Sequence, residues 1–240
     1  MVYLTGDIHG RTNRIVEFAE TMTLTKNDTI IILGDVGANY YQDNRDRIRK
    51  DDLARLKPTI FCIHGNHECR PCNIGTYELV PWNGGNVWVE SEYPNILFAK
   101  DGDIYTIEGM KYIVIGGAYS VDKFYRLATF MNWFPDEQPS DEIKSYVEQQ
   151  IQENHIDIVL SHTCPIKYEP TEMFLPQVDQ SKIDKSTEIW LDSIEERLDY
   201  LAWFCGHFHT DKHIDKMHFM YTTFETAADI KRRDNSDEDT

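Results

Sequence analysis

The sequence lacks long apolar runs, and it has few basic residues for its number of acidic ones. No stretch of 18 consecutive apolar residues is present, so we expect no transmembrane helix. Lys and Arg together number 24 against 41 Asp and Glu, which gives a net charge of −17. That charge argues against a basic face that grips nucleic acid and against an anionic membrane surface. Membrane and nucleic acid are therefore not the expected partners, and no obligatory protein partner is inferred.

Cysteine is also scarce, and residues 1–6 lack the basic and apolar segments of a secretory signal. Five cysteines in 240 residues are too few and of the wrong parity for a disulfide framework, so we expect a cytoplasmic protein. Cys69 and Cys72 form a C-x-x-C pair, which can be a redox motif or half of a zinc site. We favour incidental thiols, because the pair follows a predicted loop and no second C-x-x-C exists.

The chain does have enough apolar residues for a sizeable core. Hydrophobic residues make up 41% and aromatic residues 12% of the sequence, which excludes global disorder. No repeat or low-complexity linker divides the chain, so the length fits one large domain. We predict a single domain over residues 1–228, followed by a polar tail over residues 229–240.

Strands and helices alternate in the first third of the predicted structure. Short β-branched runs that end in Gly or polar clusters are typical of buried strands that lead into loops. The β-α-β-α-β order predicts a parallel sheet with right-handed crossovers. The expected strands cover residues 2–5, 29–33 and 59–63, and the expected helices cover residues 12–22 and 43–56.

The rest of the chain has short strands joined by Gly, Pro and Asn turns, which favour hairpins. We therefore predict a mixed α/β domain that is parallel at first and antiparallel later. The later strands are expected at residues 87–89, 95–98, 104–107, 111–115, 156–160 and 201–205, with helices from residue 140 and over 187–200, and residues 218–223 close the core.

Five loops that directly follow predicted strands carry potential metal ligands. The carboxyl ends of strands are where ligands collect in an α/β sheet, so these loops can converge. One such His is usually a structural residue, but five coincidences are much harder to explain by turns alone. Imidazole, amide and carboxylate donors without thiolate suit two ions of Mn, Fe or Zn. The loops read Gly6-Asp7-Ile8-His9-Gly10, Gly34-Asp35, Gly65-Asn66-His67-Glu68, Ser161-His162 and Gly206-His207-Phe208-His209.

This ordered series, from residue 6 to residue 209, resembles the calcineurin-like metallophosphoesterase superfamily. The resemblance implies a four-layer α/β/β/α sandwich of two mixed β-sheets, with two divalent metal ions at one edge and Mn as the first choice. It also implies that His67 is the catalytic histidine and that Glu68 supports the ligands from behind. The implied ligands are Asp7, His9 and His209 for the first ion, Asn66, His162 and His207 for the second, and Asp35 as the bridge.

The resemblance implies a phosphoester hydrolase that acts on a phosphomonoester or a small phosphodiester. A hydroxide held between the two metals would attack phosphorus in line, and His67 would protonate the leaving group. Asp35 and Asn66 would serve catalysis through the metals. Three alternatives remain: a nuclease, a protein phosphatase of the same superfamily, and a non-catalytic scaffold. The acidic charge argues against the nuclease, and the complete ligand series argues against the scaffold.

Two positions depart from the pattern of the protein phosphatases in this superfamily. Their phosphate-clamping arginines are replaced here by Asn39 and His64, which makes a protein phosphatase doubtful. Arg70 and Arg126 are the candidates to replace those cations, although Arg126 is equally readable as a surface cation on a short helix.

Two segments, residues 77–93 and 118–135, are rich in Trp, Tyr, Phe and Gly. Such segments can form an aromatic lid over a substrate pocket. The alternative is that they only pack over the edge of the sheet.

Overall fold

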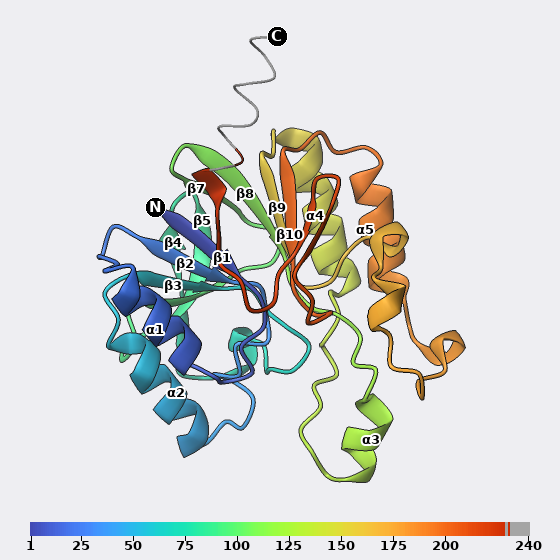
Figure 1. The fold of residues 1–240 in the computed structure, drawn as a ribbon, viewed down its shortest axis with the longest axis horizontal. Helices are drawn as coiled ribbons and strands as arrows, with labels where there is room; N and C mark the ends of the chain where they lie inside the picture. The colour runs from blue at the N-terminus through green and yellow to red at the C-terminus, as the bar shows by residue number, and fades with distance from the viewer. Residues whose placement is uncertain (229, 231–240) are drawn as a thin grey trace.

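The computed structural model describes residues 1–228 and 230, and in this part of the chain two β-sheets pack face to face between two layers of helices. Helices α1 (Asn13–Thr21) and α2 (Asn44–Ala54) cover one sheet. Helices α4 (Asp141–Glu153) and α5 (Ser186–Glu195) cover the other (Figure 1). The predicted α/β/β/α sandwich of two mixed sheets is therefore confirmed.

The first sheet contains the parallel strands predicted from the opening third. Its order is β13-β1-β2-β3-β6-β5-β4, and β1, β2, β3 and β6 are parallel neighbours. Strands β1 and β2 are buried at every position because both faces of the sheet are covered, which explains their unbroken apolar character. The strands are β1 (Val2–Thr5), β2 (Thr29–Ile32), β3 (Thr59–Cys62), β4 (Tyr77–Trp82), β5 (Gly85–Glu90), β6 (Ile96–Ala99) and β13 (Glu225–Thr226).

The second sheet corrects the prediction that the later strands are antiparallel. Its order is β11-β12-β10-β9-β8-β7, and β8, β9, β10 and β12 are parallel neighbours. Helices α4 and α5 are crossover connections, so they return the chain to the same end of the sheet, and only the edge pairs β7–β8 and β11–β12 are antiparallel. The strands are β7 (Ile104–Ile107), β8 (Met110–Ile115), β9 (Ile158–Ser161), β10 (Ala202–Cys205), β11 (Lys212–Ile214) and β12 (Met217–Phe219).

The core lies between the two sheets. Leu4, Phe61, Tyr112 and Phe204 are fully buried there, and burial of one such side chain stabilises the fold by about 2 kcal/mol. Ile230 also packs into this cluster, so that residue is not part of a polar tail. The remainder of the predicted tail, residues 229 and 231–240, lies outside the described residues.

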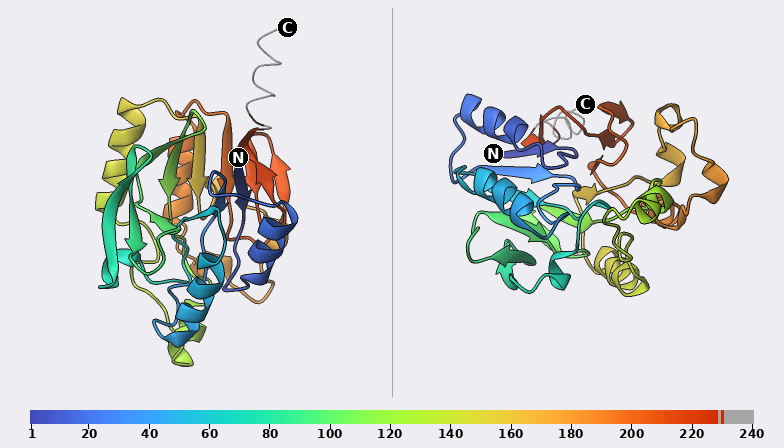
Figure 2. Two further views of the ribbon diagram at one scale, coloured as in Figure 1. Left: turned by 90° about the vertical axis from the view of Figure 1, so that its left-hand side faces the viewer. Right: turned by 90° about the horizontal axis from the view of Figure 1, so that it is seen from below.

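The two candidate lid segments, residues 77–93 and 118–135, lie in different parts of the structure. Residues 77–93 form the β4–β5 hairpin at the edge of the first sheet, where Trp82 stacks on Phe61 with ring centroids 5.0 Å apart. This segment therefore follows the packing alternative. Residues 118–135 contain helix α3 (Lys123–Ala128), which projects away from the body of the protein (Figures 1 and 2).

Short 3-10 turns complete the described chain, namely Pro71–Asn73, Ile166–Tyr168, Thr171–Met173 and Gln180–Lys182. Among the described residues, none of the helices has the length and apolar character needed to span a bilayer.

Candidate metal centre

The structure brings all the predicted ligand residues together at one edge of the two sheets. Strands β1, β2 and β3 lie side by side and parallel, as do β9 and β10, so their carboxyl ends point to the same region. Each of the five loops leaves directly from one of these strands. The convergence follows from parallel topology, because parallel strands end on the same side of a sheet.

The first donor group consists of Asp7, His9 and His209. The Nε2 atoms of His9 and His209 are 2.9 Å apart, and His209 Nε2 is 3.2 Å from Asp7 Oδ2. His9 Nε2 is 3.8 Å from the same oxygen. Ligand atoms that share one ion at about 2.1 Å lie roughly 3.0–3.4 Å apart, so these three atoms are spaced for one metal.

The second donor group consists of Asn66, His162 and His207. The side-chain oxygen of Asn66 is 2.9 Å from His162 Nε2 and 3.1 Å from His207 Nδ1. The other ring nitrogen of His162, Nδ1, lies 2.8 Å from the backbone oxygen of Leu33. That contact fixes the ring so that Nε2 faces the group, which is how proteins orient a metal-binding imidazole.

Asp35 lies between the two donor groups. Its Oδ2 is 3.8 Å from His9 Nε2, and its Oδ1 is 3.7 Å from His162 Nε2. Oδ1 also accepts a hydrogen bond of 2.7 Å from the backbone N–H of His67. One carboxylate thus faces both groups with different oxygens, which is the geometry of a bridging ligand.

The donors fit divalent cations, as the structure of the site itself shows. Asp7 Oδ2 is buried and has no hydrogen-bond partner, although an unpaired buried carboxylate oxygen is costly. The other oxygen, Oδ1, accepts the backbone N–H of His207 at 2.9 Å, so Oδ2 remains free and faces His9 and His209. A cation at this point would satisfy the carboxylate and the two facing imidazole nitrogens together.

Four of the ten described non-glycine residues with positive φ are predicted ligands. His9, Asp35, His207 and His209 all have positive φ, between 46° and 66°. Such a conformation is unfavourable for residues with a Cβ and clusters at functional sites, where the surrounding fold enforces it. Four of the seven predicted ligands therefore have an unfavourable backbone conformation, which is difficult to explain if these residues only formed turns.

Two glycines in the ligand loops are required by close approach. A Cβ on Gly34 would collide with the imidazole of His162, and a Cβ on Gly65 would collide with the carboxylate and backbone of Asp35. Each collision would displace a ligand from a second loop. The Gly-Asp and Gly-Asn-His-Glu patterns thus have a steric reason as well as a conformational one.

Electrostatics at the site keep its carboxylates ionised. Burial favours the neutral form of Asp7, but the adjacent imidazoles of His209, His162 and His9 outweigh it and lower the pKa of Asp7. Burial likewise opposes ionisation of Asp35, and the charges of His162 and His67 lower its pKa overall. Burial lowers the pKa of His207 to about 3, so its ring is neutral and available as a ligand.

Glu68 lies behind the site and supports it. The side chain is fully buried and accepts the backbone N–H groups of Gly65 at 3.0 Å and Gly37 at 3.3 Å. Burial and the neighbouring Asp35 carboxylate raise the pKa of Glu68 to about 8. Glu68 thus ties the loop after β3 to the loop after β2.

Arg126 reaches His67, although the two residues are far apart in sequence. Its Nη2 lies 2.6 Å from Nδ1 and 2.8 Å from Nε2 of His67, and its Nε donates to Asp122 at 2.7 Å. Arg126 is 4% exposed, so the interpretation as a surface cation is wrong. Burial and the Arg126 charge lower the pKa of His67, and the Asp35 charge partly opposes them.

Arg70 does not reach the candidate site. Its guanidinium is buried, forms an ion pair with Asp101 and donates from Nε to the backbone oxygen of Asp136 at 2.8 Å. The prediction that Arg70 contacts substrate phosphate is corrected on that ground, because its charge is already neutralised. Asn39 and His64, which stand where the protein phosphatases have arginines, do not supply a cation. Both are buried, and burial holds the pKa of His64 well below its ordinary value.

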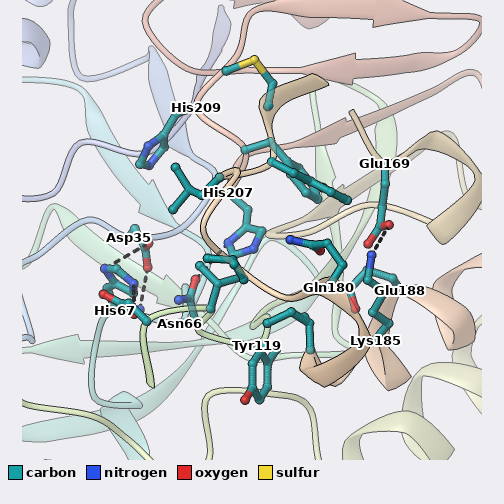
Figure 3. A pocket seen from close by; sticks show the side chains of 18 of the residues that line it. Asp35, Asn66, His67, Tyr119, Glu169, Gln180, Lys185, Glu188, His207 and His209 are labelled. Carbon is teal, nitrogen blue, oxygen red and sulfur yellow. Dashed lines mark hydrogen bonds and ion pairs between the residues drawn. The ribbon is translucent and has the colours of Figure 1, made fainter. Parts of the chain in front are cut away.

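A cavity of about 400 Å³ opens beside the donor groups (Figure 3). Asp35, Asn66, His67, His207 and His209 lie on one side of it, and Glu169, Lys185 and Glu188 lie across from them (Figure 3). Tyr119, Val121 and Asp122 come from the predicted lid segment 118–135, whereas no residue of 77–93 lines it. Apart from Gln180, most of the remaining wall is apolar, made by Met173, Phe174, Leu175, Val178, Ile183 and Phe208.

Most of that apolar wall was not predicted from the sequence. Five of its six residues belong to the 3-10 turns and loops between β9 and α5, which have neither helical nor strand periodicity. The available signal was the run Met173-Phe174-Leu175 between Pro170 and Pro176, an apolar cluster in a polar loop region. Cys69 and Cys72 are free thiols outside the cavity, and burial raises the pKa of both.

Comparisons with known proteins agree with the geometry. A family model described as calcineurin-like phosphoesterase matches residues 1–211. A solved structure from Thermus thermophilus aligns with a TM-score of 0.52 and 13% identity, over 92% of this chain and 87% of that one. The phosphopantetheinyl hydrolase PptH from Mycobacterium tuberculosis aligns with a TM-score of 0.50 and 14% identity, over 97% and 91%. Curated proteins gave no match.

Proposed function

Because the chain belongs to the calcineurin-like phosphoesterase family, we propose that it is a dinuclear phosphoesterase for a small phosphomonoester or phosphodiester with an apolar leaving group. Membership of the family implies metal-dependent hydrolysis of phosphoesters. The observation that carries the finer proposal is the position of Asp35 between two complete donor groups, at the floor of an apolar-walled cavity.

The protein residues that would hold the metals are those of the two donor groups. Asp7, His9 and His209 would bind one ion and Asn66, His162 and His207 the other, with Asp35 shared. Two divalent ions at these positions would polarise the phosphoryl oxygens and generate the nucleophile from water. We propose Mn, with Fe and Zn as alternatives, because nitrogen and oxygen donors without thiolate suit all three.

His67 and Arg126 would act on the phosphate and the leaving group. Arg126 brings its guanidinium next to His67 and can clamp a phosphoryl oxygen. A bound phosphate brings negative charge to His67 and so raises its pKa, which is the direction a general acid requires. His67 would then donate its proton to the departing oxygen.

The cavity supports a small substrate with an apolar group. Among its described lining residues Lys185 is the single Lys or Arg, and its Nζ is 2.6 Å from Glu169, so no free row of cations lines this cavity. A nuclease would need such a row to follow a polyanion. An apolar leaving group would instead pack against the wall formed by Phe174, Val178 and Phe208.

The test is an assay on nitrophenyl phosphate and bis-nitrophenyl phosphate with the metal-loaded wild type and the His67→Ala variant. We expect wild-type turnover, and in His67→Ala an unchanged metal content with kcat lowered by about 10²–10⁴, because a general acid contributes on that scale. Wild-type turnover in His67→Ala would refute the acid role. A protein with bound metal that cleaves neither ester would refute the phosphoesterase proposal.

A further inference from the structure

A group of three potential metal ligands lies outside the candidate metal centre. His213, His218 and Glu225 place one donor atom each within 4.8 Å of one another. None of them lines the 400 Å³ cavity, and none is among the residues attributed to the phosphoesterase site. They line a separate cavity of about 600 Å³.

The topology sets these three residues against one another. His213 on β11 and His218 on β12 are directly opposite in the antiparallel pair, so their side chains share one face, with ring centroids 4.3 Å apart. Glu225 lies on β13, which is hydrogen-bonded to β1 in the other sheet. The group therefore joins the edge of one sheet to the edge of the other.

Both imidazoles contact the carboxylate of Glu225. Glu225 Oε1 is 2.5 Å from His213 Nε2, and Oε2 is 2.8 Å from His218 Nδ1. Two nitrogens and one carboxylate oxygen form the three-ligand set found in open zinc sites, in which water takes the fourth position.

Among the described residues, the charged groups next to this position have other partners. The Asp211 carboxylate accepts backbone N–H groups of Tyr221 and Thr222 at 2.8 and 3.1 Å, and Lys212 Nζ pairs with Glu172. Zinc ligands lie roughly 3.3 Å apart in a tetrahedral site, so the two contacts to Glu225 would have to lengthen by less than about 1 Å. His213 is half-exposed, which leaves it free to make that adjustment.

We propose that His213, His218 and Glu225 form a third metal site, suited to zinc, that links the outer edges of the two sheets. The bound ion would hold the β11–β12 hairpin against β13. Because β11 begins three residues after His209, the same ion would also brace the loop that carries His207 and His209. Its role is structural, since it shares no ligand with the candidate metal centre.

The test compares the zinc content of the full-length wild type with that of His213→Gln. Each protein is stripped with a chelator, reloaded with Zn²⁺, desalted and measured by elemental analysis. We expect His213→Gln to hold one zinc ion fewer per chain, and its affinity for that ion to fall at least about tenfold, because a direct ligand is lost. Equal zinc content in the two proteins would overturn the proposal.

A matched control is His155→Gln, which removes a surface imidazole that faces a single carboxylate, Asp157, at 3.0 Å. It should bind as much zinc as the wild type. An anomalous difference map from zinc-soaked wild-type crystals provides the second measurement, with a peak expected between His213, His218 and Glu225. The absence of that peak would also overturn the proposal, whatever the occupancy at Asp35 and whatever the phosphoesterase activity.

Discussion

The contact between Arg126 and His67 is set by tertiary structure. It is buried on the projecting helix α3, and its guanidinium contacts both ring nitrogens of His67. The phosphate-clamping arginines of related protein phosphatases are absent, and we propose that Arg126 replaces them. The sequence around Arg126 could not show this position, because a short helix that carries an Arg has the same sequence pattern whether the side chain is exposed or buried in a cleft.

The Arg126→Ala variant should lose turnover without losing metal. We expect kcat/KM for nitrophenyl phosphate to fall by about 10²–10³, the scale on which one preorganised donor to a developing charge contributes. Arg126→Lys should recover only part of that loss, since an ammonium cannot reproduce the planar guanidinium fork. Steady-state kinetics at fixed metal content provides the measurement.

Arg55→Ala is the matched control, because Arg55 is an exposed residue at the end of α2 that pairs with Asp52 at 3.4 Å. It removes the same charge and should leave kcat/KM unchanged. Equal losses in both variants would mean that net charge, and not the contact with His67, determines the effect.

Among the structural elements, the segment between β9 and α5 supplies most of the apolar residues that line the cavity. Met173, Phe174 and Leu175 come from this segment and face the donor groups across the cavity. Phe174 also lies over Lys185, whose Nζ is 4.7 Å from the ring centroid. The apolar wall therefore has a defined position relative to the metal ligands.

The Phe174→Ala variant should weaken binding of apolar esters selectively. Removing about 60–80 Å² of apolar contact at roughly 25 cal/mol per Å² costs about 1.5–2 kcal/mol, so KM for an aryl phosphate should rise about tenfold or more. Hydrolysis of a small polar phosphomonoester should change little. Ile189→Ala, a truncation of an exposed side chain on α5, is the control. Equal effects of Phe174→Ala on both substrates would contradict the assignment of this wall.

The strands differ in how well they could be predicted from the sequence. Strands β1, β2 and β3 were predictable because they are short runs rich in β-branched and apolar residues that lead into polar ligand loops. Strand β4 contains Pro81, and β11 is short and polar, so both edge strands lacked a pattern and were missed. The parallel centre of the second sheet was also missed, because turn residues suggested hairpins where α4 and α5 make crossovers.

The candidate site was more predictable than the fold around it. Ligand types and their position after strands are local features, so the seven donors were named from the sequence. The roles of Arg70 and Arg126 depend on burial and on partners more than 30 residues away, namely Asp101 for the first and His67 for the second. Only the folded chain supplies that information.

For the molecule as a whole, the acidic charge and the buried carboxylates make stability depend on pH. Glu188 is buried beside the cavity, where Thr163 donates to Oε1 at 2.8 Å while Oε2 has no partner. Burial raises the pKa of Glu188 to about 7 from an ordinary value of 4.5. Between those values the folded chain keeps a proton that the unfolded chain has released, so this residue makes stability fall as pH rises and stop falling above pH 7.

The Glu188→Gln variant should remove that dependence. Its free energy of unfolding relative to the wild type should increase from pH 4.5 to pH 8 by up to about 3 kcal/mol, because 1 pKa unit corresponds to 1.36 kcal/mol. Chemical denaturation of both metal-free proteins at several pH values measures the difference. A difference that is constant over this range would show that Glu188 ionises normally in the folded protein.

The net charge of −17 is compatible with an anionic substrate because two dications would change the field at the one place where phosphate enters. The most direct test of the central claim is therefore a titration of the metal-free protein with Mn²⁺, followed by turnover of nitrophenyl phosphate. Activity should be absent without metal, rise to a plateau at two equivalents per chain, and stay absent in Asp35→Asn, while the surface variant Asp199→Asn follows the wild type. Turnover without metal, or full activity in Asp35→Asn, would contradict the account.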